Sequence, residues 1–484
     1  MSEKSGLKYQ VMSGLFWKFG ERIIAQGISF VISLLLARLL APEQYGTVAL
    51  ALVFINIANV FVTNGLGESL MQKKSAGDVE FSTMFFCSLG MSVLLYIIMF
   101  FGAVPIAKFY DNDSLIILIR VLSLQIPLSS VKTIQHAYVS KNMLFKKFFF
   151  STLGGTLFSG IVGIIMAFRG FGVWALVEQY LVNSVIDMCV LFITVPWRPQ
   201  ALFDKKAAKE LFGYGWKLIA AQFVNTIYSE SRSLIIGKQY SEIDLAYYNK
   251  GNQFPSLVIN NINTSISNVL FPALSSVNNS ISKLKALTRK SMKVSSYIIF
   301  PMMVGMIAIA EPMINLLLTD RWLSCVPYLQ LCCIFWMFQP IQTANVQALK
   351  AVGRSDICLK LEIVKKIIGF ALLIVSMNFG VTAIVLSNTI FGGISMIINI
   401  PPNKKLIGYG YKEQFFDLLP AGLLSVVMGC VVYMLGFIPL PTAVTLIVQI
   451  VVGVSMYIGG SYLFKVDSFM FLFGFAKSLK GRKV

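Results

Sequence analysis

Residues 29–74, SFVISLLLARLLAPEQYGTVALALVFINIANVFVTNGLGESLMQKK, contain two long apolar runs joined by the short turn ARLLAPEQYG at 37–46. Arg38 ends the first run, where its guanidinium can reach lipid phosphates. Pro42 suits the first turn of a new helix, because its missing N–H is not needed there. Tyr45 is a typical interfacial anchor. The stretch predicts two membrane-spanning helices joined by a plain connector, and it predicts no chemistry in the turn itself.

Composition extends this expectation to the whole chain. Of its 484 residues, 56% are hydrophobic and only 13% are charged, whereas soluble proteins carry about 25% charged residues. The sequence therefore predicts an all-α integral membrane protein. Apolar windows of about 20 residues, separated by Pro, Gly or charged residues, indicate about 14 transmembrane helices. They lie near 13–39, 45–67, 80–102, 114–138, 148–168, 171–195, 211–236, 244–274, 291–310, 324–349, 361–377, 381–400, 415–437 and 442–464.

The basic residues indicate how the chain is oriented. Clusters such as Lys73–Lys74, Lys404–Lys405 and the tail at 477–484 fall on alternate connections, and the other connections carry isolated basic residues. By the positive-inside rule we expect cytoplasmic N- and C-termini in a bacterial cytoplasmic (inner) membrane. This pattern accounts for the net charge of +19, so we expect no nucleic-acid partner. One histidine and no clustered ligands predict no metal site, and we expect no cofactor.

Three short sequence matches recur in the same order, which indicates an internal duplication. They predict two six-helix lobes, residues 1–200 and 201–402, followed by two additional helices and a basic tail at 403–484. An even number of spans per lobe makes the lobes parallel and pseudo-symmetric about an axis along the membrane normal. The matching pairs are FGVWALV (171–177) with FGVTAIV (379–385), LFWK (15–18) with YGWK (214–217), and IPLSSVKTIQ (126–135) with QPIQTANVQ (339–347).

Polar side chains recur at helical spacing in the first two spans of each lobe. Steps of three or four residues place each set on one helix face. Such residues can hold helices together or extend toward the membrane surface. They can also line a water-filled cavity between the lobes, which we favour because the stripes are long. The predicted lining consists of Lys18, Arg22, Gln26, Asn56, Asn59, Lys217, Asn225, Arg232, Lys250, Asn252, Asn260 and Asn263.

The chemistry of this predicted cavity favours an anionic, hydroxyl-rich substrate. Guanidinium groups match phosphate geometry, and amides match sugar hydroxyls. Carboxylates in the spans are candidates for proton or cation coupling, or else pair with a neighbouring lysine. These are Glu21, Glu178, Asp187 and Glu230. Pro127, Pro255 and Pro340 are candidate hinges, because an interior proline removes a helix hydrogen bond.

Four motifs carry a resemblance to a known family: ARLLAPEQYG, GLGESLMQK (65–73), IAKFYDND (106–113) and LLLTDRW (316–322). Essentially the whole chain resembles Wzx-type polysaccharide flippases, of the polysaccharide transporter branch of the multidrug/oligosaccharidyl-lipid/polysaccharide superfamily. The likeness is strongest to colanic acid or exopolysaccharide exporters. It implies a transporter, not an enzyme, which moves an undecaprenyl-pyrophosphate-linked oligosaccharide from the cytoplasmic to the outer leaflet by alternating access.

The resemblance also implies residue roles. Basic residues of the first helix engage pyrophosphate in related lipid II flippases, which implies this role for Lys18 and Arg22, with Lys217 as the pseudo-symmetric partner of Lys18. Glu21 occupies the neighbourhood of a coupling carboxylate of drug-efflux relatives, although here it lies between two cations. Expected partners besides the substrate are membrane lipid and a polysaccharide polymerase with its chain-length machinery.

Three other functions compete with this one. A multidrug or cation antiporter predicts a cavity rich in carboxylates and aromatic residues. An envelope polysaccharide polymerase predicts a sizeable outer loop, whereas every outer connection here is short. A scaffold gives no reason for repeated polar stripes. The basic stripes favour the flippase, while the sugar repeat and the energy source stay open.

Overall fold

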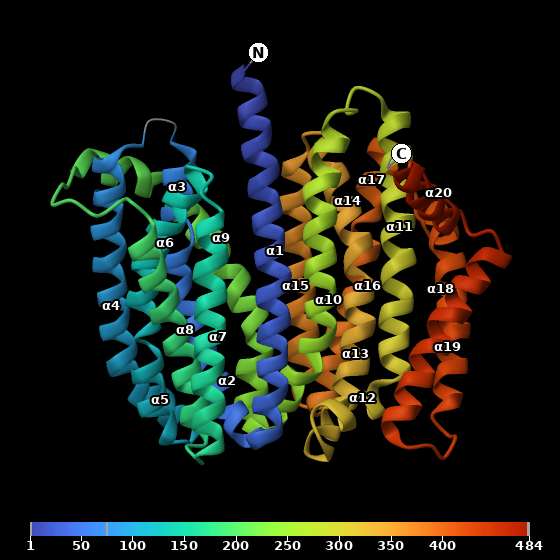
Figure 1. Cartoon of the computed structure of the whole chain (residues 1–484), viewed down its shortest axis with the longest axis horizontal. Coiled ribbons are helices and arrows are strands. Elements are labelled where there is room, and N and C mark those ends of the chain that lie inside the picture. The colour runs from blue at the N-terminus through green and yellow to red at the C-terminus, as the bar shows by residue number, and fades with distance from the viewer. Residues whose placement is uncertain (1, 74–75, 482–484) are drawn as a thin grey trace. The chain divides into compact units, whose positions relative to one another are not determined.

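The computed structural model describes residues 2–73 and 76–481, and these residues form helices and connections without any strand (Figure 1). Eleven helical segments in the described chain are long and apolar enough to cross a membrane. The protein is therefore an all-helical, multi-pass membrane protein. Three further long helices, α9, α10 and α15, are too polar to belong to that group. The count of 14 spans stays a prediction.

The chain divides into two compact units, residues 1–246 and 247–484. The first unit contains α1 (Ser2–Leu39), α2 (Pro42–Thr63), α3 (Leu66–Gln72), α4 (Asp78–Tyr110), α5 (Ser114–Leu122), α6 (Gln125–Lys141), α7 (Lys146–Phe168), α8 (Val173–Thr194) and α9 (Lys205–Gln239). Helix α10 (Glu242–Ser275) begins in the first unit and continues into the second.

The second unit continues with α11 (Ile281–Ala308), α12 (Ala310–Leu317), η1 (Asp320–Cys325), α13 (Val326–Met337), α14 (Gln339–Ala351), α15 (Ser355–Ser376), α16 (Val381–Ile398), α17 (Ile400–Ile407), α18 (Tyr411–Leu435), α19 (Thr442–Leu463) and α20 (Asp467–Gly481). The lobe boundary at residue 200 rests on the sequence repeat and stays a prediction. In the structure, α9 packs against α2, α3 and α4 within the first unit.

The turn at 37–46 has the predicted local structure. Helix α1 ends at Leu39, and α2 begins at Pro42, which occupies its first turn. The side chain of Gln44 accepts a hydrogen bond from the backbone N–H of Ala41, at 3.2 Å. This contact satisfies an N–H at the helix start, where no carbonyl one turn earlier is available. The expected connector between two spans is confirmed.

Helix α2 runs antiparallel to α9, and the chain approaches closely at two points, one in the turn after α2 and one between α2 and the start of α10. At the first point a Cβ on Gly65 would lie 2.4 Å from the carbonyl oxygen of Gly215. At the second point a Cβ on Gly46 would lie 1.8 Å from the carbonyl oxygen of Glu242. Only glycine lets two backbones approach this closely. The glycine of the opening motif is therefore a packing requirement of the first unit.

Helix α18 is attached to α11 by charged pairs. Arg289 of α11 donates from Nη2 to Oδ1 of Asp417 at 2.7 Å, and Lys285 lies 2.8 Å from Glu413. Tyr409 also donates its hydroxyl hydrogen to the buried Asp417 carboxylate, at 2.9 Å. A buried carboxylate is stable when it is paired and hydrogen-bonded in this way. These contacts tie α18 to α11 within the second unit.

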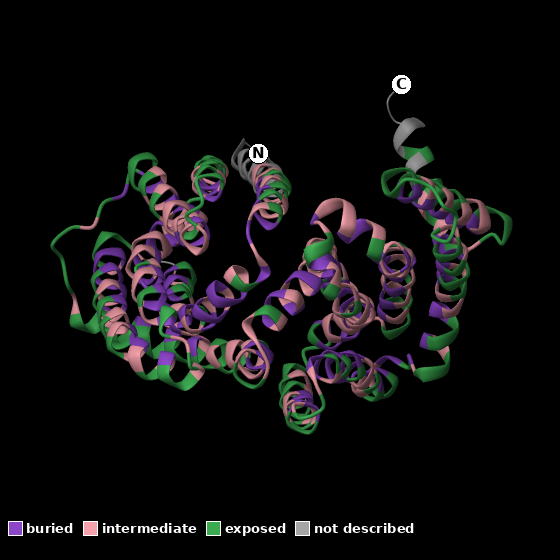
Figure 2. Ribbon diagram, turned by 90° about the horizontal axis from the view of Figure 1, so that it is seen from below, coloured by how far each residue is buried: buried purple, intermediate pink, exposed green. Residues whose placement is uncertain are grey.

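Large apolar side chains are exposed on the outer helices of both units. Ile193 of α8 is 77% exposed and Leu463 of α19 is 76% exposed, and Figure 2 shows exposed faces along helices in each unit. Soluble monomers rarely expose apolar surface on this scale. Hydrocarbon is the solvent that accepts such faces, in agreement with the membrane-spanning lengths of the helices.

The contact at Gly46 can be tested by adding one methyl group. We expect Gly46→Ala to lower the unfolding temperature of the purified protein in detergent, because the new Cβ overlaps the Glu242 carbonyl. Overpacking of this kind costs about 1–3 kcal/mol. Gly102→Ala in α4 is the matched control, since a Cβ at this position would meet no atom within 4 Å. Equal unfolding temperatures for the two variants would contradict the packing.

Candidate functional site

The first predicted stripe lies on α1. The side chain of Lys18 falls outside the described residues, while Arg22 and Gln26 are half-buried. Glu21 accepts a hydrogen bond from the Thr152 hydroxyl of α7, at 2.8 Å. Helix α1 packs along α7 in this unit. The Glu21 carboxylate is therefore hydrogen-bonded to the neighbouring helix α7, and its predicted coupling role stays a prediction.

A polar surface forms where α2 and α9 meet. Asn56 donates from Nδ2 to Oε1 of Glu230 at 3.2 Å, which brings together two of the predicted site residues. Asn225 and Ser229 are exposed on the same helix as Glu230, and Lys217 is exposed nearer the start of that helix, about 20 Å from Glu230 along its axis. We call these five residues the α2–α9 polar face. It offers amides, a hydroxyl, a carboxylate and one ammonium group, a combination suited to sugar hydroxyls and phosphate.

Asn59 and Arg232 lie deeper than the α2–α9 polar face. The Arg232 side chain is buried, with its residue only 5% exposed, and its guanidinium lies 5.3 Å from the centre of the Tyr228 ring. Arg232 also donates from Nη2 to the Tyr228 hydroxyl at 3.3 Å. Within the described residues, Nε of Arg232 and Oδ1 of Asn59 are buried without a hydrogen bond. Both groups therefore retain unused hydrogen-bonding capacity beside the polar face.

Asp187 of α8 is part of a buried polar cluster. Its Oδ2 lies 3.0 Å from Nζ of Lys132 in α6, and its carboxylate accepts a hydrogen bond from Ser151 of α7. The Ser151 hydroxyl lies 3.0 Å from the Asp187 carbonyl oxygen as well. This geometry corresponds to the alternative in which the carboxylate pairs with a neighbouring lysine. The coupling role of Asp187 stays a prediction.

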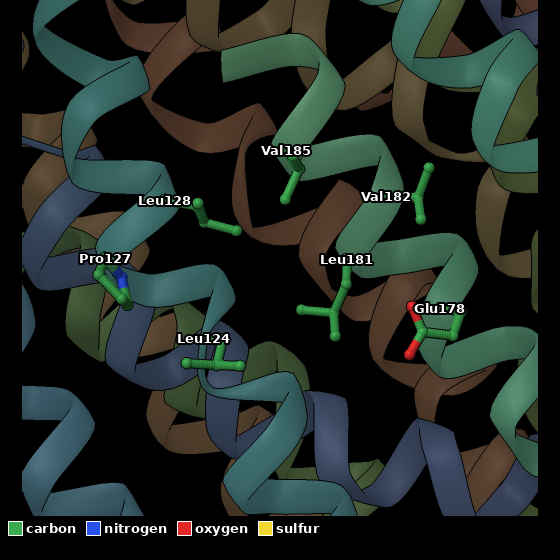
Figure 3. Close-up of a pocket in the computed structure, with 7 residues that line it drawn as sticks. All are labelled: Leu124, Pro127, Leu128, Glu178, Leu181, Val182 and Val185. Atoms are coloured by element: carbon green, nitrogen blue, oxygen red, sulfur yellow. The ribbon is translucent and has the colours of Figure 1, made fainter. Parts of the chain in front are cut away.

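Glu178 and Pro127 face a different part of the molecule. They line one groove between the α5–α6 junction and α8, together with Leu124, Leu128, Leu181, Val182 and Val185 (Figure 3). No described residue makes a hydrogen bond or ion pair with Glu178. Glu178 thus differs from Glu21, Asp187 and Glu230, whose carboxylates bond to residues of other helices.

The stripe on α10 is divided within the second unit. Lys250 is buried, donates from Nζ to Oε1 of Gln253 at 3.2 Å, and lies 5.7 Å from the centre of the Trp322 ring. The side-chain oxygen of Asn252 accepts a hydrogen bond from Nε1 of Trp336, at 2.8 Å. These two residues are therefore bound to η1 and α13 side chains of their own unit.

The rest of the α10 stripe is more accessible. Asn260 is exposed, and Asn263 is half-buried with an Oδ1 that lacks a hydrogen bond within the described residues. Four turns of regular spacing thus include both packed and accessible positions. The spacing of residues along the sequence does not distinguish packed from accessible positions. It shows that residues share a helix face, but not which neighbouring segment packs on that face.

The three candidate hinge prolines occupy two kinds of position. Pro127 lies in the first turn of α6, just after the junction with α5, and Pro340 lies in the first turn of α14, after α13. A first turn accommodates proline without the loss of a hydrogen bond. Pro255 lies inside the continuous helix α10. Hinge roles for all three stay predictions.

Several partners of these residues were missed by sequence analysis. Tyr228 covers Arg232, Trp336 binds Asn252, and Thr152 binds Glu21. The spacing of four residues between Tyr228 and Arg232 is a signal that was available, since such positions face each other on a helix. The other two pairs are 84 and 131 residues apart, and no local pattern indicates them.

Comparison with known proteins gives concordant matches. Residues 35–327 match the family described as "Polysaccharide biosynthesis protein". The lipopolysaccharide biosynthesis protein WzxC of Escherichia coli (strain K12) is 23% identical over 89% of each chain. The succinoglycan biosynthesis transport protein ExoT of Rhizobium meliloti (strain 1021) is 23% identical, over 70% of this chain and 69% of its own. The teichuronic acid biosynthesis protein TuaB of Bacillus subtilis (strain 168) is 23% identical over 72% of each chain.

Solved structures share the fold. The inward closed conformation of the lipid II flippase MurJ matches with a TM-score of 0.75 and 18% identity, over 94% of this chain and 99% of that chain. An inward-facing multidrug resistance MATE family transporter of the MOP superfamily matches with a TM-score of 0.61 and 14% identity, over 80% of this chain and 98% of that chain. The family match covers more than half of the sequence, and the chain therefore belongs to the polysaccharide biosynthesis protein family.

Proposed function

We propose that this protein is a flippase that moves a polyprenyl-pyrophosphate-linked oligosaccharide from the cytoplasmic to the outer leaflet by alternating access. Its family membership and the names of WzxC, ExoT and TuaB support a role in polysaccharide export. The MurJ-like fold supports a lipid-linked substrate. We place it in the bacterial inner membrane with both termini in the cytoplasm, near a polysaccharide polymerase and its chain-length machinery.

The observation that carries this proposal is the α2–α9 polar face. Asn56 and Glu230 are joined by a hydrogen bond, and Asn225, Ser229 and Lys217 are exposed on α9. A charged side chain that faces lipid costs about 2.5–3.5 kcal/mol even on the lenient insertion scale. The exposed groups avoid this cost if water and a polar headgroup reach them. Their amides suit sugar hydroxyls, and the ammonium of Lys217 suits a phosphate.

The carboxylates favour a flippase over a cation antiporter. Glu21, Asp187 and Glu230 each have a protein partner, supplied by Thr152, Lys132 and Asn56 respectively. A carboxylate that is already paired contributes less to binding a cationic drug. A polymerase is disfavoured by the connections at residues 40–41, 111–113 and 169–172, because these are too short to form an outer domain.

The headgroup assignment can be tested in vesicles. We expect Lys217→Gln to slow the transfer of an undecaprenyl-pyrophosphate oligosaccharide about tenfold or more, because one charge-assisted hydrogen bond to phosphate is lost. Transfer is followed by the access of an impermeant glycosidase to the sugar. Lys405→Gln, an exposed lysine of α17, is the matched control and should transfer at the wild-type rate.

Two results would count against these assignments. Wild-type transfer in Lys217→Gln would remove this residue from the site while leaving the flippase assignment intact. Absence of transfer by the wild-type protein, with the correct sugar supplied, would favour the antiporter instead.

A measurement of stability can distinguish two roles of Asp187: a stabilising ion pair with Lys132, or proton or cation coupling. We expect Asp187→Asn to lower the unfolding temperature, since breaking a buried ion pair costs about 3–5 kcal/mol, and somewhat less here because Lys132 is partly exposed. Adding Lys132→Gln to this variant should restore part of the loss. A stable Asp187→Asn protein whose transport no longer responds to a proton gradient would instead establish a coupling role.

A further inference from the structure

The groove in Figure 3 is apolar along almost its whole length. Six aliphatic side chains line it, and its volume is about 460 Å³. Leu124 is 41% exposed and Val185 is 39% exposed, so the groove is accessible from the outer surface of the first unit. Because this surface belongs to membrane-spanning helices, hydrocarbon chains are the molecules that contact it.

One wall of the groove lies at the junction of α5 and α6. Helix α5 ends at Leu122 and α6 begins at Gln125, and Ser123 and Leu124 between them keep helical dihedrals within one span, with tighter hydrogen bonds from Leu124 to Val121 and from Ile126 to Ser123. Leu124 and Pro127 at this tightened junction form one wall of the groove, together with Leu128. The opposite wall is a single face of α8, because its four lining residues follow the spacing i, i+3, i+4 and i+7 from Glu178 to Val185.

Glu178 is the one ionisable residue among those that line the groove. It is the sixth residue of α8, about 8 Å along the helix axis from Val173. A helix of 22 residues is about 33 Å long, close to the thickness of the hydrocarbon core, so Glu178 lies near the boundary with the headgroups. An ionised carboxylate at this depth is costly unless a partner satisfies it. Within the described part of the chain, no residue does so.

We propose that this groove binds a phospholipid whose headgroup carries a primary ammonium group. The ammonium donates hydrogen bonds to the Glu178 carboxylate, and one acyl chain lies along Leu181, Val182 and Val185. Charge complementarity selects the headgroup, because an ammonium has three donors and a carboxylate is an acceptor only. The aliphatic walls select a hydrocarbon chain and offer nothing to sugar hydroxyls. This lipid site is separate from the α2–α9 polar face and from the proposed transport activity.

The test uses the full-length protein, delipidated in detergent and examined by native mass spectrometry with added phosphatidylethanolamine or phosphatidylcholine of identical chains. A quaternary ammonium has no N–H to donate, so wild-type protein should retain the primary-ammonium lipid in preference. We expect Glu178→Gln to weaken retention of phosphatidylethanolamine about tenfold, the effect of one charge-assisted hydrogen bond, and to abolish the preference. Glu68→Gln, an exposed glutamate of α3, is the control and should match wild type.

A second variant tests the groove itself. Val182→Trp fills the groove and should reduce retention of both lipids, while unfolding temperatures verify that each variant is folded. Equal retention of the two lipids by wild type would overturn the proposal. So would unchanged phosphatidylethanolamine retention in Glu178→Gln, even if Val182→Trp lost both lipids, since the groove would then bind acyl chains without regard to the headgroup. Because the readout is binding, failure here leaves the transport proposal untouched.

Discussion

Hydrocarbon offers no hydrogen-bond partner, so a chain that spans a membrane must satisfy its polar groups within the protein or with water. For the backbone the solution is the helix, and the described residues are helical from end to end apart from short connections. Each polar side chain needs its own hydrogen-bond or ion-pair partner. The hydrogen bond between Asn56 and Glu230 and the ion pair between Lys132 and Asp187 are two such pairs. Each joins two helices of the first unit.

Close helix contact is what makes these pairs possible. Gly46 and Gly65 bring α2 against the chain at and beyond α9, and the Asn56–Glu230 bond lies between these two points. Small residues perform this function in membranes because lipid exerts little hydrophobic force between helices. The exposed polar groups of α9 are held beside α2 by this packing. The two glycine contacts thus flank the Asn56–Glu230 bond of the α2–α9 polar face.

Charge in this protein serves three distinct purposes. In the second unit, Arg289 and Asp417 join α11 to α18. In the first unit, Asp187 pairs with Lys132 in a buried cluster, whereas Lys217 stays exposed on α9, where we propose that it binds phosphate. Glu178 serves none of these three purposes, because it lines an apolar groove. A count of charges therefore says little about function until each group's neighbours are known.

The sequence by itself determined the class of protein and the position of most helices. The span expected at 244–274 is observed as α10, Glu242–Ser275, and Pro42 occupies the first turn of α2 as predicted. These features follow from local rules: helix length against bilayer thickness, and the missing N–H of proline. The motifs that resemble the flippase family are equally local, and the family match agrees with them.

Only the tertiary structure decided which polar groups meet. Glu230 forms a hydrogen bond with Asn56, which is 174 residues away in the sequence. Arg232 was predicted to lie on the same polar stripe as Lys217, but its side chain is buried and hydrogen-bonded to Tyr228. Periodicity assigns a residue to a helix face, but the helix that covers this face is set by packing between segments distant in the chain. For the same reason the groove beside Glu178 was not predictable, since it requires the junction of α5 and α6 to lie against α8, a segment about 50 residues further along the chain.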